Sequence, residues 1–322
     1  MAKQGQDSFL EAFASTKLGR NDVLAEIEGS VRWYRFEKLL QRLRPDGAGR
    51  PPYDPLLMFR ALLLQQWYSL SDAELEESLN DRVSFRRFLG LGLEDDAPDH
   101  TTLCRFRNRL IEAGLTEKLF AEFDKQMEER GLILKKGTML DATLVAAATA
   151  RPPLGAAPDE ATNPDARFAV RDGKAGSSYG YKVHVGVDCG SRLIRTAKLT
   201  PGNVNDTVVA DDLVRYDEAA VYAEKAYAKA ARRAMLRAHG IKDRIMHKSW
   251  RGGPALSIWQ KRHNSLIAPV RAEVETVFTV FAVIKRRMRY TRVRYRGTVK
   301  NAAHLLILAI AYNMRTAARR AQ

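Results

Sequence analysis

The pattern of apolar residues changes at Gly137, and this change divides the chain into two kinds of structure. From residue 8 to about residue 130 the apolar side chains recur at helical spacing, which predicts a set of packed helices. Beyond Gly137, short apolar or alternating runs separate helical segments, a pattern typical of an α/β fold. We therefore expect an all-α N-terminal domain over residues 1–135 and an α/β domain over residues 136–322.

Capping residues locate helix starts in the N-terminal half. Asp54 and Pro55 precede a leucine-rich run, and they suit the N-cap and the first helical position. Ser71 and Glu74 have the spacing of a capping box ahead of Leu75. Because such side chains satisfy the backbone N–H groups that a helix start leaves without partners, we expect helices to begin at these two places.

A further helix, opened by Asp99, carries Arg105, Arg107 and Arg109 within residues 103–111. Together with the helix before it, this segment fits a helix-turn-helix motif whose second helix contacts DNA through these arginines. It fits equally well an ordinary helical bundle whose arginines face solvent. The sequence of this segment alone leaves both interpretations open.

The second half predicts a mixed sheet with helices on both faces. A buried strand at residues 138–145 is followed by a surface excursion at residues 150–178, which is rich in Ala, Pro and Gly. An alternating hairpin comes next, and strands then alternate with helices. The other expected strands are residues 181–188, 193–199, 220–224 and 241–247, and the expected helices are residues 205–216, 229–239, 267–289 and 301–319.

The chain carries a net charge of +15 at pH 7 and has a pI near 9.9, which favours a polyanionic partner. One stretch near the C-terminus is basic throughout, contains no acid, and includes Tyr290 and Tyr295. A solvated surface is the alternative, but it leaves this density of like charge without a counter-charge, so we expect contacts with phosphates. This basic run consists of Lys285, Arg286, Arg287, Arg289, Arg292, Arg294, Arg296 and Lys300.

The cysteines and the apolar stretches indicate the compartment. Cys104 and Cys189 lack metal-ligand spacing, and we expect both to pack as small apolar side chains in a reducing cytoplasm. The N-terminus lacks the apolar run of a signal peptide, and the apolar stretch at residues 305–312 is too short to span a bilayer. We therefore expect a cytoplasmic protein without a membrane partner.

Three acids are candidates for a metal-dependent site. Asp141 lies inside an apolar strand, where a carboxylate is costly unless it is paired or binds a metal. Glu224 ends an expected strand, and Glu275 lies on the expected helix at residues 267–289. If the three converge, they suit two divalent metal ions acting on a phosphodiester. Spacing alone does not show convergence, and a single acid is more often solvated or paired with a base.

Other polar residues of this half suit structural roles. His184 lies on an alternating strand without a second ligand nearby in sequence, so we expect it to be packed or hydrogen-bonded rather than metal-bound. Asp188 is expected to shape a turn together with Gly190, and Asp206 is expected to cap the helix that follows it.

A series of short motifs, each weak alone but specific together, runs along nearly the whole chain. They are residues 49–54, 98–103, 140–143, 163–167, 179–184, 200–203 with Asp206, 222–225, and 294–297 before Asn301. In these motifs the chain resembles the transposases of the insertion-sequence-five group, within the wider insertion-sequence-four-like DDE superfamily of bacterial insertion sequences.

The resemblance implies a ribonuclease-H-like fold and a site holding two ions of Mg²⁺ or Mn²⁺. It also implies that Asp141 is the first catalytic acid and Glu275 the third. The family has an aspartate as the second acid, where this chain has Glu224, and a glycine two residues later, where it has Ala226. Glutamate is one methylene longer, and a misplacement on the order of 1 Å can cost roughly 100-fold in rate.

A second departure follows Glu275. The family usually has a basic residue seven positions after the third acid, but this chain has Ala282 there and Lys285 ten positions on, because Thr-Val-Phe is repeated at once. At about 100° per residue, Lys285 falls about 80° from the face of the acid, whereas Arg286 returns to within about 20° of it. A helical bulge would change this register again.

We therefore expect an insertion-sequence transposase. Water would attack to free a 3′-hydroxyl at the element end, and that hydroxyl would then attack target DNA. The implied partners are double-stranded DNA, as terminal inverted repeats and target, and a second copy of the chain in a homodimer, all at the nucleoid. The alternatives are a DNA-binding protein of transposase descent that has lost catalysis, which the two departures favour, and a stand-alone nuclease.

Overall fold

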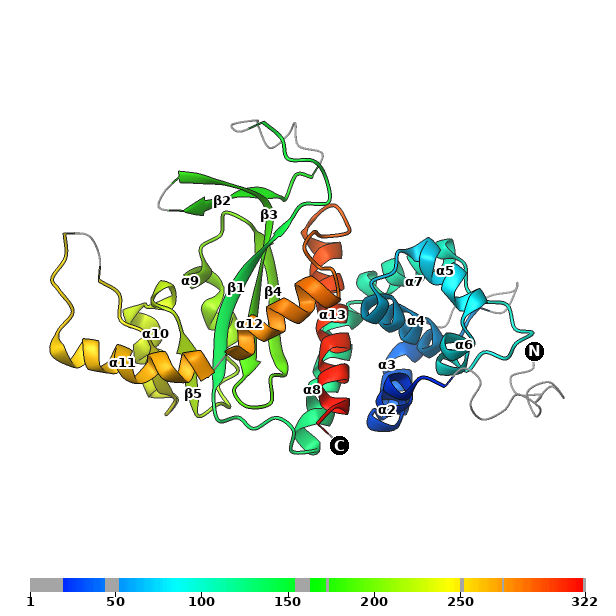
Figure 1. Ribbon diagram of the computed structural model, residues 1–322, viewed down its shortest axis with the longest axis horizontal. Helices are drawn as coiled ribbons and strands as arrows, with labels where there is room; N and C mark the ends of the chain where they lie inside the picture. Colours follow the sequence, from blue (N-terminus) through cyan, green and yellow to red (C-terminus); the bar gives the residue numbers. More distant parts are fainter. Residues whose placement is uncertain are drawn as a thin grey trace. The chain divides into compact units, whose positions relative to one another are not determined.

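The computed structural model describes residues 20–43, 52–153, 163–171, 174–249, 252–273 and 275–320 (Figure 1). The chain folds into two compact units, residues 1–126 with 306–322 and residues 127–305. We call the first the helical unit and the second the sheet unit. This division differs in two ways from the expected one, which has a single boundary at residue 135. The first unit ends at Gln126, and the residues from Leu306 onward group with it.

Helices of the helical unit begin where the capping residues predict. Asp54 accepts hydrogen bonds from two backbone N–H groups in the first turn of α4. Ser71 and Glu74 form the complete capping box of α5, and the side chain of Asp99 caps α7. The helices are α2 (Asp22–Ser30), α3 (Trp33–Leu40), η1 (Gln41–Leu43), α4 (Pro55–Tyr68), α5 (Asp72–Asp81), α6 (Val83–Leu89), α7 (His100–Glu112) and α8 (Leu115–Glu129), of which α8 ends in the sheet unit.

Helix α4 lies at the centre of the helical unit, since it is apolar on all sides and nearly all of it is buried. Phe59 stacks on Phe36 of α3 with ring centroids 5.6 Å apart. The indole N–H of Trp67 donates a hydrogen bond to the carbonyl of Ala311, 2.8 Å away. Ala311 belongs to α13 (Thr298–Ala318), so the last part of the chain completes this core.

The sheet unit contains a mixed sheet, as expected. β1 pairs antiparallel with β3 and parallel with β5, and β5 pairs parallel with β6. β3 also pairs antiparallel with β2 and β4, so the central order is β4–β3–β1–β5–β6. The strands are β1 (Thr138–Ala146), β2 (Arg167–Arg171), β3 (Lys174–Asp188), β4 (Ile194–Pro201), β5 (Ala220–Ala223) and β6 (Lys242–Ile245).

Short helices pack against this sheet and bury its apolar side chains. Leu140 of β1 and Val221 of β5 pack with Leu213 of η3 and Leu236 of α10 in one buried cluster. Helix α12 contacts β1, and both are labelled in Figure 1. These elements are α9 (Asp206–Val209), η3 (Ala210–Leu213), η4 (Lys225–Tyr227), α10 (Ala230–Ala238), α11 (Ile258–Glu273), α12 (Glu275–Ala282) and the π-helical turn η5 (Val283–Arg287).

Three features differ from the expectations. The excursion at residues 150–178 contains β2 and the start of β3, and its residues 154–162, 172 and 173 lie outside the described residues. The expected helix at residues 205–216 is two short turns, α9 and η3. Cys104 is exposed on α7, so the expectation of a core cysteine is wrong there, while the half-buried Cys189 is also a free thiol.

Candidate catalytic site and basic surface

The sheet places two of the three expected catalytic acids next to each other. β1 and β5 are parallel neighbours, with Thr138 opposite Val221. Continuing this register by three residues sets Asp141 beside Glu224, the residue that follows β5. Adjacent strands lie about 4.8 Å apart. Both side chains are half-buried, so solvent reaches both carboxylates.

Arg232 of α10 holds the turn that carries Glu224. The turn closes through a 3.0 Å hydrogen bond from the Tyr227 N–H to the Glu224 carbonyl. The Arg232 side chain is 0% exposed. It donates to the Tyr227 carbonyl at 2.5 Å, to the Thr207 carbonyl at 2.6 Å, and to the carboxylate of Asp211 at 2.5 and 3.2 Å. One buried guanidinium therefore joins α9, η3 and η4, and it fixes the backbone at the second acid.

The hydroxyl of Tyr227 is buried among carboxylates. Its oxygen has no hydrogen-bond partner among the described residues. Burial raises the pKa of the phenol, and the negative charges of Asp206, Asp141 and Glu224 raise it further. All three acids therefore disfavour ionisation of this hydroxyl.

Asp206 does not cap a helix, so that expectation is wrong. The cap of α9 is Asn205, which accepts a hydrogen bond from the backbone N–H of Thr207. Asp206 instead pairs with Lys182 of β3, with Nζ and Oδ1 2.9 Å apart. This ion pair depends on the tertiary structure, because the folded β3 brings the half-buried Lys182 close to Asp206, although the two residues lie 24 positions apart.

His184 of β3 is packed and hydrogen-bonded, as expected. It is 0% exposed, and its Nε2 lies 2.9 Å from the Thr200 hydroxyl. Burial lowers the pKa of its imidazole to about 4, and the charge of Lys182 lowers it too, although Asp206 opposes the shift. The ring is therefore neutral at physiological pH.

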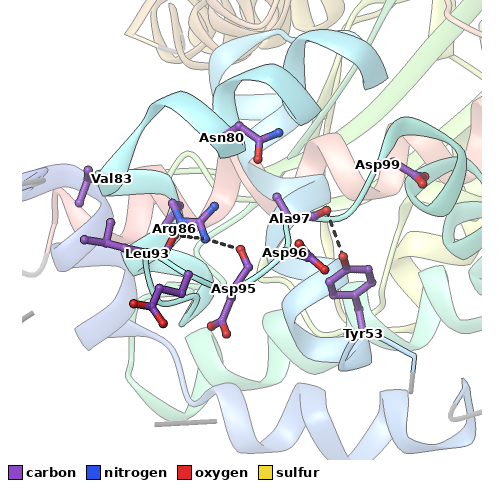
Figure 2. Close-up of a pocket in the computed structure, with 10 residues that line it drawn as sticks. Tyr53, Asn80, Val83, Arg86, Leu93, Asp95, Asp96, Ala97 and Asp99 are labelled. Carbon is purple, nitrogen blue, oxygen red and sulfur yellow. Dashed lines mark hydrogen bonds between the residues drawn. The ribbon is translucent and has the colours of Figure 1, made fainter. Parts of the chain in front are cut away.

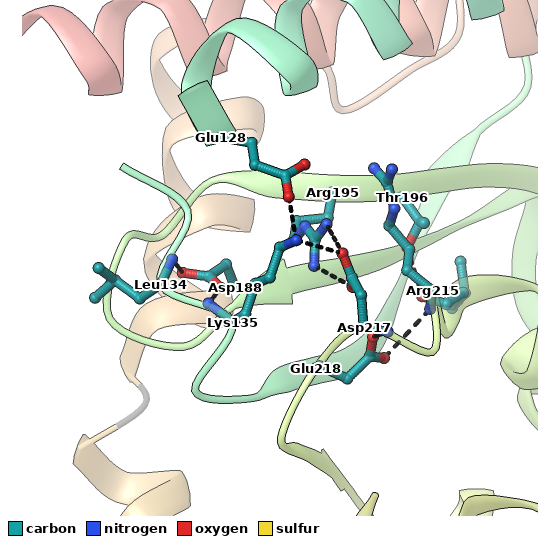
Figure 3. A network of polar contacts seen from close by, with 10 residues as sticks. Glu128, Leu134, Lys135, Asp188, Arg195, Thr196, Arg215, Asp217 and Glu218 are labelled. Atoms are coloured by element: carbon teal, nitrogen blue, oxygen red, sulfur yellow. Dashed lines mark hydrogen bonds and ion pairs between the residues drawn. The ribbon is translucent and has the colours of Figure 1, made fainter. Parts of the chain in front are cut away.

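A polar network fixes the entry to β1 (Figure 3). The Asp188 carboxylate accepts hydrogen bonds from the backbone N–H groups of Lys135, at 2.9 Å, and of Ser191, at 3.3 Å, which confirms its expected role in the turn. The buried Arg195 binds both oxygens of Asp217, at 2.8 and 2.9 Å. This guanidinium and the Lys135 ammonium hold the pKa of Asp217 well below its usual range. The strand that carries Asp141 thus starts from a rigid anchor.

The expected third acid, Glu275, is the first residue of α12, and its side chain lies outside the described residues. In place of the expected single helix at residues 267–289, the described residues form α11 up to Glu273, α12 from Glu275, and then the π-helical turn η5. A π-turn takes one residue more than an α-turn. Because η5 includes Lys285, Arg286 and Arg287, the register calculated for a regular α-helix does not apply to these three bases. Burial lowers the pKa of Lys285, and no described carboxylate pairs with it.

The basic run lies on η5, on the loop between η5 and α13, and, with Lys300, on the first turn of α13. Within it, Lys285 and Arg294 are half-buried. The other members are exposed, namely Arg286, Arg287, Arg289, Arg292, Arg296 and Lys300. Tyr290 is buried and belongs to the core beneath the loop. The exposed members remain candidates for contacts with phosphates.

Asparagines that the sequence motifs contain shape this loop. Asn301 is buried, and its amide donates to the carbonyls of Tyr295 and Gly297, each at 2.7 Å. Asn163, also buried, accepts from the backbone N–H of Gly297 at 3.2 Å. Asp165 accepts from the N–H of Thr298 at 2.7 Å and caps α13. Sequence reasoning did not assign these roles, and the partners of Asn163 and Asp165 lie more than a hundred residues away in the sequence.

The arginines of α7 differ in their surroundings. Arg107 is 4% exposed and forms an ion pair with Asp72, with Nη2 and Oδ1 2.5 Å apart. It lies inside the helical unit, and it is therefore not part of a DNA-facing surface. Arg109 is half-buried and donates to the carbonyl of Leu43. Arg105 is exposed, so of the three it remains the candidate for DNA contact.

The helical unit also has an acidic hollow of about 550 Å³ (Figure 2). Asp95, Asp96 and Asp99 are among its lining residues. Arg86 organises the loop by donating to the carbonyls of Gly92 and Asp95, each at 2.5 Å. Because the carboxylates repel phosphate, this hollow does not belong to a DNA-binding surface.

The described side chains contain no group of three metal-ligand types placed to hold one ion. Asp141 and Glu224 supply adjacent carboxylate oxygens, which are the ligands that Mg²⁺ and Mn²⁺ prefer. The residues present therefore fit part of a divalent metal site, and a further ligand is required. Within the described ranges, no helix combines the length and apolarity needed to cross a bilayer.

Two family models match successive parts of the chain, and the second continues past Leu306 into residues that group with the helical unit. The model of a Transposase domain (DUF772) matches residues 13–109, and that of the Transposase DDE domain matches residues 134–314. Among solved structures, the chain is similar to piggyBac transposase in a synaptic complex with hairpin DNA, determined by cryo-EM. That alignment has 11% identity and covers 94% of this chain and 73% of the other, with a TM-score of 0.44.

The match to the DDE domain includes β1 with Asp141, Glu224 just before η4, and the basic run. Transposases of this family generally use divalent metal ions. The matched segment exceeds half of the chain, and the protein therefore belongs to the Transposase DDE domain family, as a DDE transposase of the insertion-sequence type.

Proposed function

We propose that this transposase cleaves and joins DNA strands at the ends of its own insertion sequence, with Asp141, Glu224 and Glu275 as its catalytic acids. The observation that carries the proposal is the parallel register of β1 and β5, which sets Asp141 beside Glu224. We also infer that the chain belongs to the insertion-sequence-five group, because its motifs follow that pattern from residue 49 to residue 301.

The three acids bind the metal ions from different elements of the sheet unit. Asp141 and Glu224 hold the metal site from two neighbouring strands, and Glu275 approaches it from the start of α12. Two divalent ions of Mg²⁺ or Mn²⁺, when bound, help to activate the attacking oxygen and stabilise the leaving oxygen of a phosphodiester. The half-buried carboxylates orient the reacting phosphate, and the sheet behind them limits access of bulk water.

The basic run supplies the DNA-binding surface beside the site. Its exposed arginines contact phosphates and position the duplex without reading its sequence. Arg105 adds a contact from the helical unit, where a helix-turn-helix role for α7 stays a prediction. The DNA partners are the terminal inverted repeats and the target. We infer a homodimer on DNA, because two element ends react together, and a location at the bacterial nucleoid in the cytoplasm.

The reaction is tested with a labelled duplex that carries one element end. The full-length protein is expected to nick it in Mg²⁺ or Mn²⁺ and to lose nicking in EDTA. Asp141→Asn is expected to abolish nicking while leaving duplex binding unchanged, because amide and carboxylate have the same shape. Asp243→Asn is the matched control, since Asp243 lies on β6 and pairs with Arg233. Equal nicking by the wild-type and Asp141→Asn proteins would contradict the assignment.

DNA binding is tested separately by fluorescence anisotropy. Reversing Arg287, Arg292 and Arg296 to glutamate together is expected to weaken binding to every duplex and to flatten its dependence on salt. An unchanged affinity and an unchanged slope would show that the basic run is only a solvated surface. Because this assay needs no metal, it separates loss of binding from loss of chemistry.

A further inference from the structure

A cavity of about 260 Å³ lies in the sheet unit where β1 ends. One wall consists of the last residues of β1 and the chain just after them, including Thr149 and Arg151. The other walls are Ser178 and Tyr179 of β3 and Arg292 of the basic run. Neither Asp141 nor Glu224 lines it, so this cavity is separate from the carboxylate site.

Two arginines from distant parts of the sequence meet at this cavity. Arg151 lies with its guanidinium carbon 5.2 Å from the ring centre of Phe168. The backbone on either side of Arg292 is hydrogen-bonded to Ala146. The N–H of Ala146 donates to the carbonyl of Thr291, and the N–H of Val293 donates to the carbonyl of Ala146, each at 2.9 Å. No acid is among the lining residues. The described lining residues thus include two cationic side chains.

The hydroxyl of Thr149 also lies at this cavity. Its oxygen is buried, and it has no hydrogen-bond partner among the described residues. A buried hydroxyl without a partner destabilises a fold, and such groups are rare unless a ligand or water satisfies them. Thr149 thus offers a donor at a place where two cations converge.

The cavity wall is preformed because two backbones touch. A Cβ on Gly180 would lie 2.2 Å from the carbonyl oxygen of Val145 and 2.7 Å from the amide nitrogen of Ala147. The N–H of Ala147 also donates to the Tyr179 carbonyl at 3.1 Å. Only glycine permits this approach, and the close contact fixes β3 against the end of β1.

We propose that this cavity binds one backbone phosphate of the DNA. The inference rests on the proposed function, and it adds a phosphate site that lies apart from the reacting phosphate. Guanidinium groups and a hydroxyl donor match the oxygens of a phosphodiester. Arg292 lies between Arg289 and Arg294 in the basic run, so a strand that follows this surface reaches the cavity. The site positions DNA and reads no base.

The test uses the full-length protein, a fluorescein-labelled DNA duplex of mixed sequence, and anisotropy at several salt concentrations. Thr149→Val is nearly isosteric and removes only the hydroxyl. It is expected to weaken binding about 10-fold without changing the salt slope, because a neutral donor releases no counterion. The melting temperature is expected to stay equal or to rise, which separates this variant from a folding defect.

Arg151→Gln is expected to weaken binding by about 10-fold and to reduce the salt slope by about 0.9, the value for one phosphate. Arg237→Gln on α10 is the matched control, since it removes the same charge at an exposed position away from the cavity. It is expected to leave both quantities nearly unchanged.

The outcomes distinguish the two proposals. If the triple reversal in the basic run weakens binding but Thr149→Val and Arg151→Gln behave like the control, the cavity proposal is overturned and the proposed function stands. A lower melting temperature of Thr149→Val, with unchanged affinity, would assign the hydroxyl a structural role and also overturn it. If the wild-type protein binds no duplex, the proposed function fails and this inference fails with it.

Discussion

Glu224→Asp is expected to raise the rate of DNA cleavage. The family has the shorter acid at this position, and the longer one displaces the carboxylate by one C–C bond, about 1.5 Å at a fixed backbone. The backbone is fixed, because Arg232 binds the carbonyl of Tyr227 and the N–H of Met246 donates to the carbonyl of Ala223 at 3.2 Å. The turn therefore cannot retreat to compensate for the extra methylene.

The size of the gain follows from this displacement. A misplacement on the order of 1 Å costs roughly 100-fold when reacting groups depend on orientation, so we expect a gain of up to about 100-fold in Mg²⁺. Mg²⁺ demands near-ideal octahedral geometry, whereas Mn²⁺ binds oxygen sites more tightly. The wild-type rate is therefore expected to be higher in Mn²⁺, and the gain from Glu224→Asp smaller.

The assay is cleavage of a labelled terminal-repeat duplex by both proteins in each metal. Glu94→Asp is the matched control, because it shortens an exposed glutamate of the helical unit and is expected to change nothing. Wild-type cleavage in Mg²⁺ as fast as that of Glu224→Asp would refute the reasoning. If both proteins bind the duplex but neither cleaves it in either metal, the result favours a DNA-binding protein that has lost catalysis.

Three further predictions concern stability. Tyr227→Phe is expected to leave the free energy of unfolding equal or up to about 1 kcal/mol higher in urea denaturation, since it removes a hydroxyl without a described partner, and a clear loss would contradict this. Arg232→Met is expected to lose about 2–4 kcal/mol, because it leaves the carbonyls of Tyr227 and Thr207 without their donor, and a loss under about 1 kcal/mol would show that the clamp is dispensable. His184 has its pKa lowered to about 4, so the unfolded chain takes up a proton first as the pH falls below about 6.5. The free energy of unfolding therefore falls by about 2 kcal/mol between pH 7 and pH 5 because of this histidine. Wild type is expected to show this dependence of the unfolding free energy on pH, and His184→Gln is expected to lack it.

Features that depend on local interactions were predictable from the sequence. The starts of α4, α5 and α7 follow from Asp54, Ser71 and Asp99, because a cap and the N–H groups that it satisfies lie within one turn. The mixed sheet also follows, since the alternation of β3 and the apolar run of β1 are properties of single segments.

Features that depend on distant partners were not predictable. Asp206 has the position of a cap, yet it pairs with Lys182, which only the folded β3 brings near. Arg107 has the position of a DNA-contacting residue, yet Asp72 binds it inside the helical unit. The start of β3 was missed, because Ala- and Gly-rich sequence has little strand propensity and pairing with β2 supplies the stabilisation.

In the candidate site, too, the sequence predicts local features but not those that depend on distant partners. The adjacency of Asp141 and Glu224 needs the parallel pairing of β1 with β5, whose residues lie more than eighty positions apart, so the sequence predicts the acids but not their register. The Arg232 clamp and the Tyr227 hydroxyl gave no sequence signal, because an arginine on a short helix resembles a solvated residue until its burial is known.

The break in the helix after Glu275 bears on how far any single substitution restores activity. The repeated Thr-Val-Phe moves the first base from the seventh to the tenth position after the acid, and this base, Lys285, lies within the π-helical turn η5. A π-turn is the usual way in which a helix absorbs inserted residues without losing its packing, and the buried Val280 and Ile284 show that the apolar face is kept across it. The π-turn therefore changes the direction of the basic side chains and keeps the apolar side chains buried. Glu224→Asp corrects the second acid alone and leaves the displaced base unchanged, so we expect it to restore only part of the activity.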